Sequence, residues 1–313
     1  MKRATSLHPI ARVLVGWLTV ADKLKNLIPT LGKRGPHRVL IGDLNFAGIP
    51  GKVYTPAEGK GIPGVAFGHD WRLGVDAYHA TLRHLASWGI AVAAPDTEKG
   101  WVPNHRGFAS DLETALQILA GVRLGNGNVV VQPNNLFLAG HGMGASAAVL
   151  AATSRPYDKV AQSQRTPTLK GVMAIYPSDA SPSPYEAAKS VSAPGLVLEP
   201  GALTNVPSGN AARMAAQWEG DVIYREIEGA THDGFHEKVL RKFLYGTASL
   251  EFSKQDLVRA LMTGFVLAED SKKYQEFRET NVKLKGTQTA TQHELFSRLP
   301  ENADLQKQLK ALL

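Results

Sequence analysis

The chain has 313 residues, 43% of them hydrophobic, which is enough for one large α/β domain with appendages. It contains no cysteine, which excludes disulfides, thiolate metal sites and a cysteine nucleophile, and no apolar run reaches the roughly 18 residues of a membrane span. The formal net charge of +7 equals the excess in residues 1–40, where eight Lys and Arg face one Asp, so the rest of the chain is formally neutral.

The first 37 residues form a basic segment of their own. Apolar side chains recur in it at helical spacing, which predicts an amphipathic helix: Ile10, Val13, Leu14, Trp17, Leu18, Ala21, Leu24 and Ile28. Such a helix packs on the main domain or a second subunit, or attaches to an anionic membrane. A signal peptide is disfavoured because no small-x-small cleavage site follows. We expect residues 1–38 to dock on a protein partner or an anionic membrane surface, and the protein to be cytoplasmic or peripheral to the membrane.

Residues 38–250 alternate strands and helices. Short antiparallel edge strands are expected at 38–41 and 52–54, followed by strands at 65–68, 90–94, 135–139, 171–175, 195–198 and 222–227. Helices are expected at 78–88, 111–122 and 145–152. This alternation predicts a mostly parallel central sheet with helices on both faces, and function at the carboxyl ends of its strands.

Residues 251–313 have a more polar, helical composition. Ser253 and Asp256 suggest a helix start, and Leu257, Leu261 and Phe265 a buried stripe. Residues 286–292 are expected to be a loop before a last short helix that ends at Leu313. We interpret this part as a C-terminal helical extension that packs on the core.

The sequence Gly140-His141-Gly142-Met143-Gly144 matches a nucleophile elbow, GxSxG, except that glycine replaces the serine. The intact motif places the serine on a strained turn between a strand and a helix, and both elements are expected here. A dinucleotide-binding turn is set aside because no acidic residue follows at the required distance. Gly142 is therefore a degenerate nucleophile position.

Three further loops supply the remaining parts of such a site. His232 follows the last strand of the domain, where the chain order nucleophile, acid, histidine places the base. The position of the acid falls on Gly201, so it is also degenerate, with Glu199 or Asp179 as alternative acids. The backbone N–H groups of His69 and Met143 are the expected oxyanion hole.

The matching pieces are residues 64–69, 85–97, the elbow and residues 229–232. Through them the chain resembles the dienelactone hydrolase, chlorophyllase and bacterial cutinase-like polyester hydrolase branch of the α/β hydrolases, over about residues 38–247. The resemblance implies an α/β hydrolase fold and an ester or acyl ligand. It departs from the family at Gly142 and Gly201.

These observations predict a non-catalytic pseudo-hydrolase that binds an acyl or ester ligand, a protein or a membrane. The alternative is a carboxylic ester hydrolase, either an esterase with a Ser-to-Gly substitution at position 142 or an enzyme that uses His232 with water. Ser146 lies one helical turn beyond the elbow and is expected to pack in the helix.

The sequence does not indicate a metal ion, a cofactor or a nucleic acid as a ligand. The residues His69, Asp70, His141, His232 and His236 could lie near one another, but they lack a metal-ligand signature. We predict no metal, no cofactor and no nucleic-acid partner.

Overall fold

The structure, a computed structural model, describes residues 24–153, 169–202, 210–238 and 251–299. Most of the predicted amphipathic segment, residues 1–23, lies outside the described residues, as does the end of the predicted last helix. The described end of the N-terminal segment, residues 24–31, is helical. Its Leu24 and Leu31 are fully buried in the same apolar cluster as Val258 and Leu261 of the C-terminal part, so this end belongs to the core.

Nine strands form one sheet in the order β1-β2-β4-β3-β5-β6-β7-β8-β9. They are β1 (Val39–Asp43), β2 (Gly51–Pro56), β3 (Gly59–Gly68), β4 (Ala91–Pro95), β5 (Val129–His141), β6 (Leu169–Ile175), β7 (Gly195–Pro200), β8 (Val222–Ile227) and β9 (Thr287–Ala290). The pairs from β4 through β8 are parallel. β1, β2 and β9 pair antiparallel at the edges, so the predicted mostly parallel α/β sheet is confirmed.

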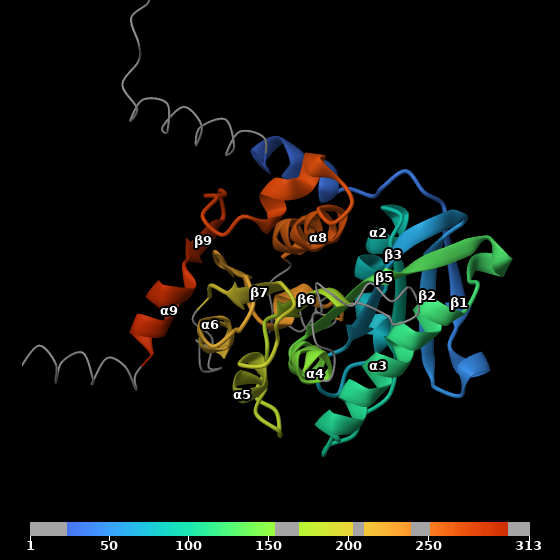
Figure 1. The fold of residues 1–313 in the computed structure, drawn as a ribbon, viewed down its shortest axis with the longest axis horizontal. Helices are drawn as coiled ribbons and strands as arrows, with labels where there is room; N and C mark the ends of the chain where they lie inside the picture. The colour runs from blue at the N-terminus through green and yellow to red at the C-terminus, as the bar shows by residue number, and fades with distance from the viewer. Residues whose placement is uncertain (1–23, 154–168, 203–209, 239–250, 300–313) are drawn as a thin grey trace, which may run out of the picture.

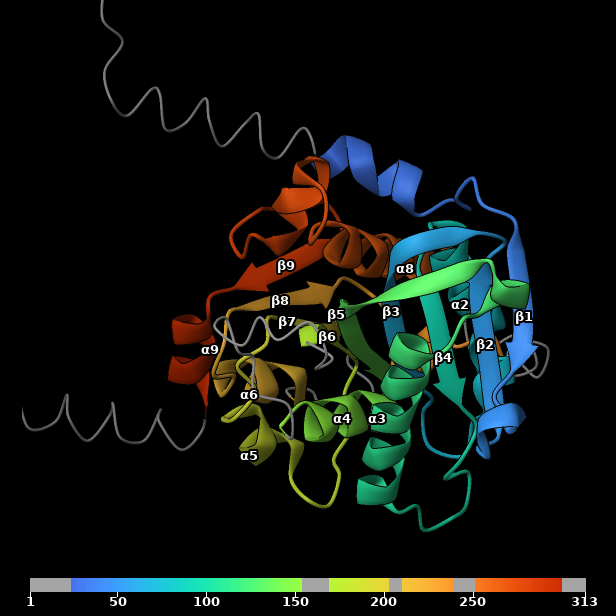
Figure 2. The ribbon, with the colours of Figure 1, turned by 45° about the vertical axis from the view of Figure 1, so that its right-hand side comes forward.

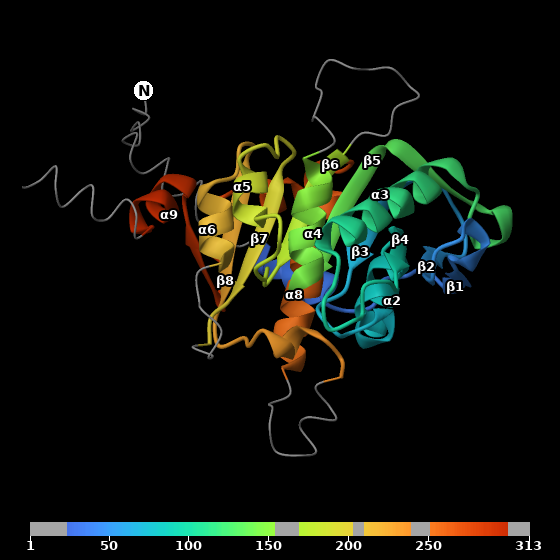
Figure 3. The ribbon, with the colours of Figure 1, turned by 90° about the horizontal axis from the view of Figure 1, so that it is seen from below.

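Helices cover both faces of the sheet (Figures 1 and 2). One apolar cluster joins the sheet to α3 (His105–Gly121), α4 (Met143–Ala152), α5 (Pro184–Ala188), α6 (Asn210–Ala216) and α9 (Gln292–Arg298). The other joins the opposite face to α2 (His79–Ser87) and α8 (Phe252–Leu267). Seen from below, α3, α4, α5 and α6 lie in front of the sheet (Figure 3).

Helix ends follow the expected capping chemistry. α3 begins at His105, six residues before the predicted start, because the Asn104 side chain accepts a hydrogen bond from the Gly107 N–H. Thr291 and Glu294 form a reciprocal capping box at α9. Short 3-10 turns occur at η1 (Asn45–Ala47), η2 (Val75–Tyr78), η3 (Gly125–Gly127), η4 (Asp233–Phe235) and η5 (Lys272–Arg278).

The C-terminal part differs from its prediction in one respect. The loop expected at residues 286–292 instead contains β9, which pairs antiparallel with β8. Four residues of mixed polarity carry too little periodicity to indicate a strand, and the pairing is supplied by the exposed edge of β8. The segment after residue 250 therefore completes the sheet as well as covering it.

Candidate functional site

The elbow lies where the sequence predicts it, between the end of β5 and the start of α4. Gly142 has φ 54° and ψ −117°, a backbone conformation that L side chains rarely adopt. The turn is also tight: a Cβ on Gly144 would lie 2.2 Å from the carbonyl carbon of Gly68 at the end of β3. A strand-to-helix turn of this geometry places the backbone of position 142 at the carboxyl edge of the sheet.

The space of the missing side chain at position 142 is filled by Asp70, from the loop that follows β3. A Cβ placed on Gly142 would lie 2.0 Å from Asp70 Oδ1 and 2.2 Å from its Cγ. Oδ1 accepts a hydrogen bond of 2.8 Å from the Met143 N–H. The carboxylate thus takes both the volume of a side chain at the elbow and the backbone donor assigned to the oxyanion hole.

His232 faces the same carboxylate. Its Nε2 lies 3.7 Å from Asp70 Oδ2, and the two side chains are 14% and 13% exposed. This distance is longer than a hydrogen bond, so the two side chains lie close together without sharing one. The structure brings Gly142, Met143 and His232 together around Asp70, which adjoins all three.

A series of hydrogen bonds through buried side chains connects Asp70 to the backbone of His232. The Asp70 N–H donates to the Tyr78 hydroxyl at 3.1 Å, and the hydroxyl lies 2.8 Å from His141 Nδ1. His141 Nε2 lies 3.0 Å from the His232 carbonyl oxygen. Because a carbonyl only accepts, Nε2 carries the proton of His141, and Nδ1 accepts from Tyr78.

His141, the residue between the first two glycines of the elbow, is therefore structural. It is fully buried, and burial, with the nearby His232, moves its pKa well below the usual value of a histidine. Burial likewise raises the pKa of Tyr78 well above its ordinary value. The hydrogen bonds that link Asp70 to His232 therefore run through two neutral side chains, Tyr78 and His141. They hold the loop after β3 and the loop after β8 in fixed positions relative to each other.

The other nitrogen of His232 lacks the carboxylate of a triad. Nδ1 is buried without a hydrogen-bond partner among the described residues. Both candidate acids are bound by tyrosines, since Glu199 accepts from the Tyr224 hydroxyl and Asp179 accepts from Tyr185 at 2.5 Å. At Gly201 a Cβ would lie 2.7 Å from the Ile227 carbonyl oxygen of β8.

The loop that carries His232 is held by the start of α8. The Glu251 carboxylate accepts from the Thr231 N–H at 3.0 Å and from its hydroxyl at 2.6 Å. Gln255 donates to the Gly234 carbonyl oxygen at 2.7 Å. This role of Glu251 could not be predicted, because nothing in the sequence pairs residue 251 with the loop 20 residues earlier.

The ring of His69 is held in place by two backbone carbonyl groups. Its ring lies between two carbonyl oxygens, 2.9 Å from that of Asp70 and 2.8 Å from that of Thr97. Burial lowers its pKa despite these two acceptors. The ring therefore anchors the loop after β3, and with it Asp70, to the loop after β4.

Ser146 makes the contact expected of a packing residue. It is fully buried, and its hydroxyl donates to the Ser178 carbonyl oxygen. It is therefore engaged away from the space at position 142 and is no substitute nucleophile.

An exposed aromatic rim adjoins Asp70 along the chain. Trp71 is 46% and Trp101 is 70% exposed, and the Trp71 indole donates to the Trp101 carbonyl oxygen at 3.3 Å. The Arg72 guanidinium stacks 3.5 Å from the centre of the Trp101 ring, a favourable cation–π geometry. These side chains form an exposed aromatic surface in the loops that follow β3 and β4.

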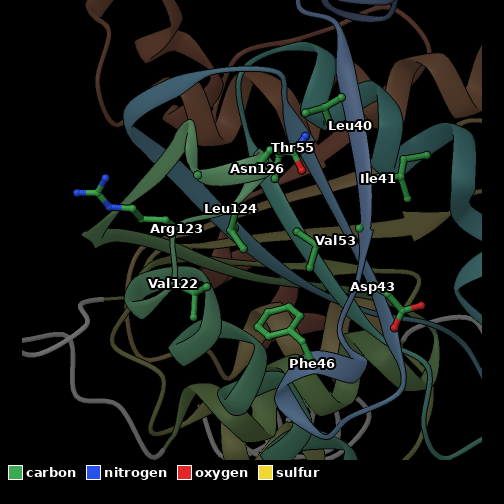
Figure 4. Close-up of a pocket in the computed structure, with 13 residues that line it drawn as sticks. Leu40, Ile41, Asp43, Phe46, Val53, Thr55, Val122, Arg123, Leu124 and Asn126 are labelled. Atoms are coloured by element: carbon green, nitrogen blue, oxygen red, sulfur yellow. The ribbon is translucent and has the colours of Figure 1, made fainter.

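A cavity of about 330 Å³ lies at the opposite end of β5, between β1, β2 and η3 (Figure 4). Its wall includes Phe46, Val53, Val122 and Leu124. The acidic side chain at its rim, Asp43, is bound to Lys52 at 2.9 Å. The cavity holds none of the predicted site residues, and it adjoins the start of the strand whose end forms the elbow.

No group of three or more histidine or carboxylate side chains in the described residues is placed to hold a metal ion. The rings of His141 and His232 meet edge to face, with their centres 4.7 Å apart, but both nitrogens of His141 are already engaged in hydrogen bonds. The five residues considered as a cluster therefore form a hydrogen-bonded and stacked group.

No protein-family model matches the sequence, and no curated protein is significantly similar to it. Among the described residues, no helix is both long and apolar enough to cross a membrane. The geometry of the site is thus the basis for a functional proposal.

Proposed function

We propose that this chain is an α/β hydrolase-type protein that has lost serine-based acyl transfer and binds an acyl or ester ligand at the remodelled elbow. The elbow geometry after β5, the loop after β3 beside it and the histidine after β8 support this architecture. They are the three parts from which an ester hydrolase builds its site.

One observation carries the proposal: the Asp70 carboxylate occupies the place of the side chain missing at Gly142. A chain whose elbow lacks a nucleophile forms no acyl-enzyme, and loss of a triad serine typically costs about six orders of magnitude in turnover. The polar groups that remain, Met143 N–H, Asp70 and His232, recognise a ligand by hydrogen bonding. The Trp71 and Trp101 surfaces add apolar contact.

The test is titration of ¹⁵N-labelled protein with a series of short alkyl esters, followed by NMR. We expect the amide signal of Met143 to shift progressively, because an ester carbonyl that binds there displaces the Asp70 carboxylate. Ala120, at the far end of α3, is a suitable reference amide. Unchanged Met143 and Asp70 signals throughout the series would contradict ligand binding at the elbow.

The second candidate is ester hydrolysis by water with His232 as general base. Its support is the position of Nε2, which lies 3.7 Å from the carboxylate that fills the space at Gly142. This activity requires that His232→Ala abolish a turnover measurable in the parent protein. Turnover retained in that variant would place the chemistry elsewhere.

Docking through residues 1–38 also remains a proposal, supported by the local charge. Because Leu24 and Leu31 are buried in the core, the test deletes residues 1–23 alone. We expect loss of co-sedimentation with vesicles containing anionic phosphatidylglycerol, without loss of fold. Equal sedimentation of both proteins would rule out membrane docking by this segment.

A further inference from the structure

We propose that a cleft at the C-terminal end of α2 binds the phosphate headgroup of an anionic phospholipid. This site rests on the proposed docking of residues 1–38 and deepens it, because it places the headgroup and fixes which side of the molecule faces the membrane. The cleft has a volume of about 410 Å³ and lies apart from the elbow. Its walls include Pro29, Lys33, Arg34, Pro36 and Trp88.

Three hydrogen bonds fix the loop that forms one wall of the cleft to the end of α2. The Gly35 N–H donates to the Ser87 hydroxyl at 2.8 Å, and the His37 N–H donates to the Ser87 carbonyl oxygen at 3.0 Å. The Trp88 indole donates to the Lys33 carbonyl oxygen at 2.9 Å. A Cβ on Gly35 would lie 2.2 Å from the Ser87 carbonyl oxygen, so only glycine allows this approach. The backbone of the cleft is therefore in place before a ligand binds.

Two cations at the cleft have no acidic partner. Lys33 and Arg34 are both exposed, and neither forms an ion pair with a carboxylate in the described part of the chain. The carboxylate of Asp256, which adjoins Gly32, is bound to Arg259 at 3.3 Å instead. An ammonium and a guanidinium on adjacent residues attract a phosphate group and supply several donors to it.

The charge around the cleft favours a surface of many phosphates over a single soluble anion. Residues 24–40 contain no Asp or Glu, and Lys25 and Arg38 are exposed there in addition to the two cations of the cleft. Each Lys or Arg close to an anionic membrane adds to its attraction. The half-buried ring of Trp88 provides apolar surface of the kind that favours the headgroup level of a bilayer.

The cleft and the elbow lie at opposite edges of the sheet. Trp88 precedes β4, whereas Gly142 follows the end of β5. Both strands pair parallel to β3, so the start of β4 and the end of β5 are at opposite edges. A membrane bound at the cleft therefore leaves Asp70 and His232 on the far side of the molecule. The acyl or ester ligand of the elbow then enters from water and is not taken from the bilayer.

The experiment measures co-sedimentation of the full chain with vesicles of phosphatidylglycerol and phosphatidylcholine. We expect Lys33→Gln/Arg34→Gln to bind about 30-fold more weakly than the parent protein, because each cation near an anionic surface contributes about fivefold. Lys99→Gln/Arg106→Gln is the matched control: it removes the same charge from two exposed side chains at the carboxyl edge, and it should bind as the parent protein does. Inorganic phosphate should release no more protein than chloride of equal ionic strength.

Amide hydrogen exchange on the vesicles tests the orientation. Exchange should slow at residues 33–38 and stay unchanged at residues 98–103. Slowing at residues 98–103 alone would overturn the proposal, as would release by phosphate beyond the chloride control or preferential binding of a single-stranded DNA oligonucleotide at the cleft.

Failure of the cleft is distinguishable from failure of docking. Equal sedimentation of the parent protein and Lys33→Gln/Arg34→Gln would overturn the headgroup site, and loss of sedimentation on deletion of residues 1–23 would then leave docking by that segment standing. A parent protein that does not sediment with these vesicles would overturn both. Ester binding at the Met143 amide is measured separately and does not depend on either result.

Discussion

Two glycines stand where the sequence analysis expected the nucleophile and the acid of a triad, and their surroundings differ. At Gly142 the empty space is occupied by a carboxylate from another loop, which also binds the adjacent Met143 N–H. At Gly201 the direction of a side chain is blocked by the Ile227 carbonyl oxygen of β8. One position has been filled by a carboxylate, and the other has been closed by the backbone.

His232 is positioned differently from the histidine of a catalytic triad. A triad holds its histidine by a carboxylate at Nδ1 and aims Nε2 at the nucleophile. Here Nδ1 has no partner among the described residues, and the nearby carboxylate is on the Nε2 side. The loop of His232 is positioned instead through its backbone, by His141 on one side and Glu251 on the other.

The strongest test of this contrast restores the serine with and without removal of the carboxylate. Gly142→Ser alone forces Asp70 away from the Met143 N–H, and loss of this charge-assisted hydrogen bond should lower the free energy of unfolding by about 3 kcal/mol. We expect no ester hydrolysis from this variant. In Asp70→Ala/Gly142→Ser the space and the oxyanion donor are free, so p-nitrophenyl acetate hydrolysis should rise about 10- to 100-fold, as for a serine and histidine without an acid.

The gain must disappear when His232→Ala is added to the double variant. Adding Gly201→Asp should give no further gain, because its Cβ meets the Ile227 carbonyl oxygen at 2.7 Å. If Gly142→Ser alone hydrolysed p-nitrophenyl acetate as fast as the double variant, Asp70 would not block the elbow. The difference drawn between Gly142 and Gly201 would then be wrong.

The sequence was sufficient to place the framework of the site but not the group that fills it. The alternation of elements predicts the parallel sheet, and the spacing of glycines predicts the elbow, because both depend on local periodicity and turn chemistry. Asp70 was seen only as a member of a histidine-rich group, since its contact with Gly142 joins residues on two different strand ends. Glu251 was missed for the same reason.

The second prediction concerns the support of the His232 loop. Glu251→Gln retains the size of the side chain but replaces the charged acceptor of the Thr231 N–H and hydroxyl. We expect the free energy of unfolding to fall by about 2–3 kcal/mol, the contribution of hydrogen bonds to a buried charge.

The loop should also gain mobility, seen as faster amide hydrogen exchange at residues 229–235 with no change in α3. Glu294→Gln, at the exposed capping box of α9, is a matched control expected to leave that loop unchanged. Equal exchange in the two variants would mean that Glu251 does not support His232.

The last prediction concerns the pH dependence of stability, because the loops around the elbow are held by buried, neutral histidine side chains. Burial, with Arg259 nearby, lowers the pKa of His84 to about 4, and burial lowers those of His69 and His141 in the same direction. Below the unfolded value of about 6.5 the unfolded chain takes up a proton that the folded chain does not, so stability falls as pH decreases. For His84 the loss between pH 7 and pH 5 is about 2 kcal/mol.

His84 lies on α2, away from the hydrogen-bonded chain, so its replacement calibrates the effect without altering the elbow. Denaturant unfolding of His84→Gln should lose about 2 kcal/mol less than the parent protein between pH 7 and pH 5, and should retain a decrease due to His69 and His141. If the variant and the parent protein showed the same decrease, His84 would be protonated in the folded state. If the variant showed no decrease at all, the neutral state of His141 that follows from its burial would be wrong, and with it the hydrogen bond from the Tyr78 hydroxyl to Nδ1.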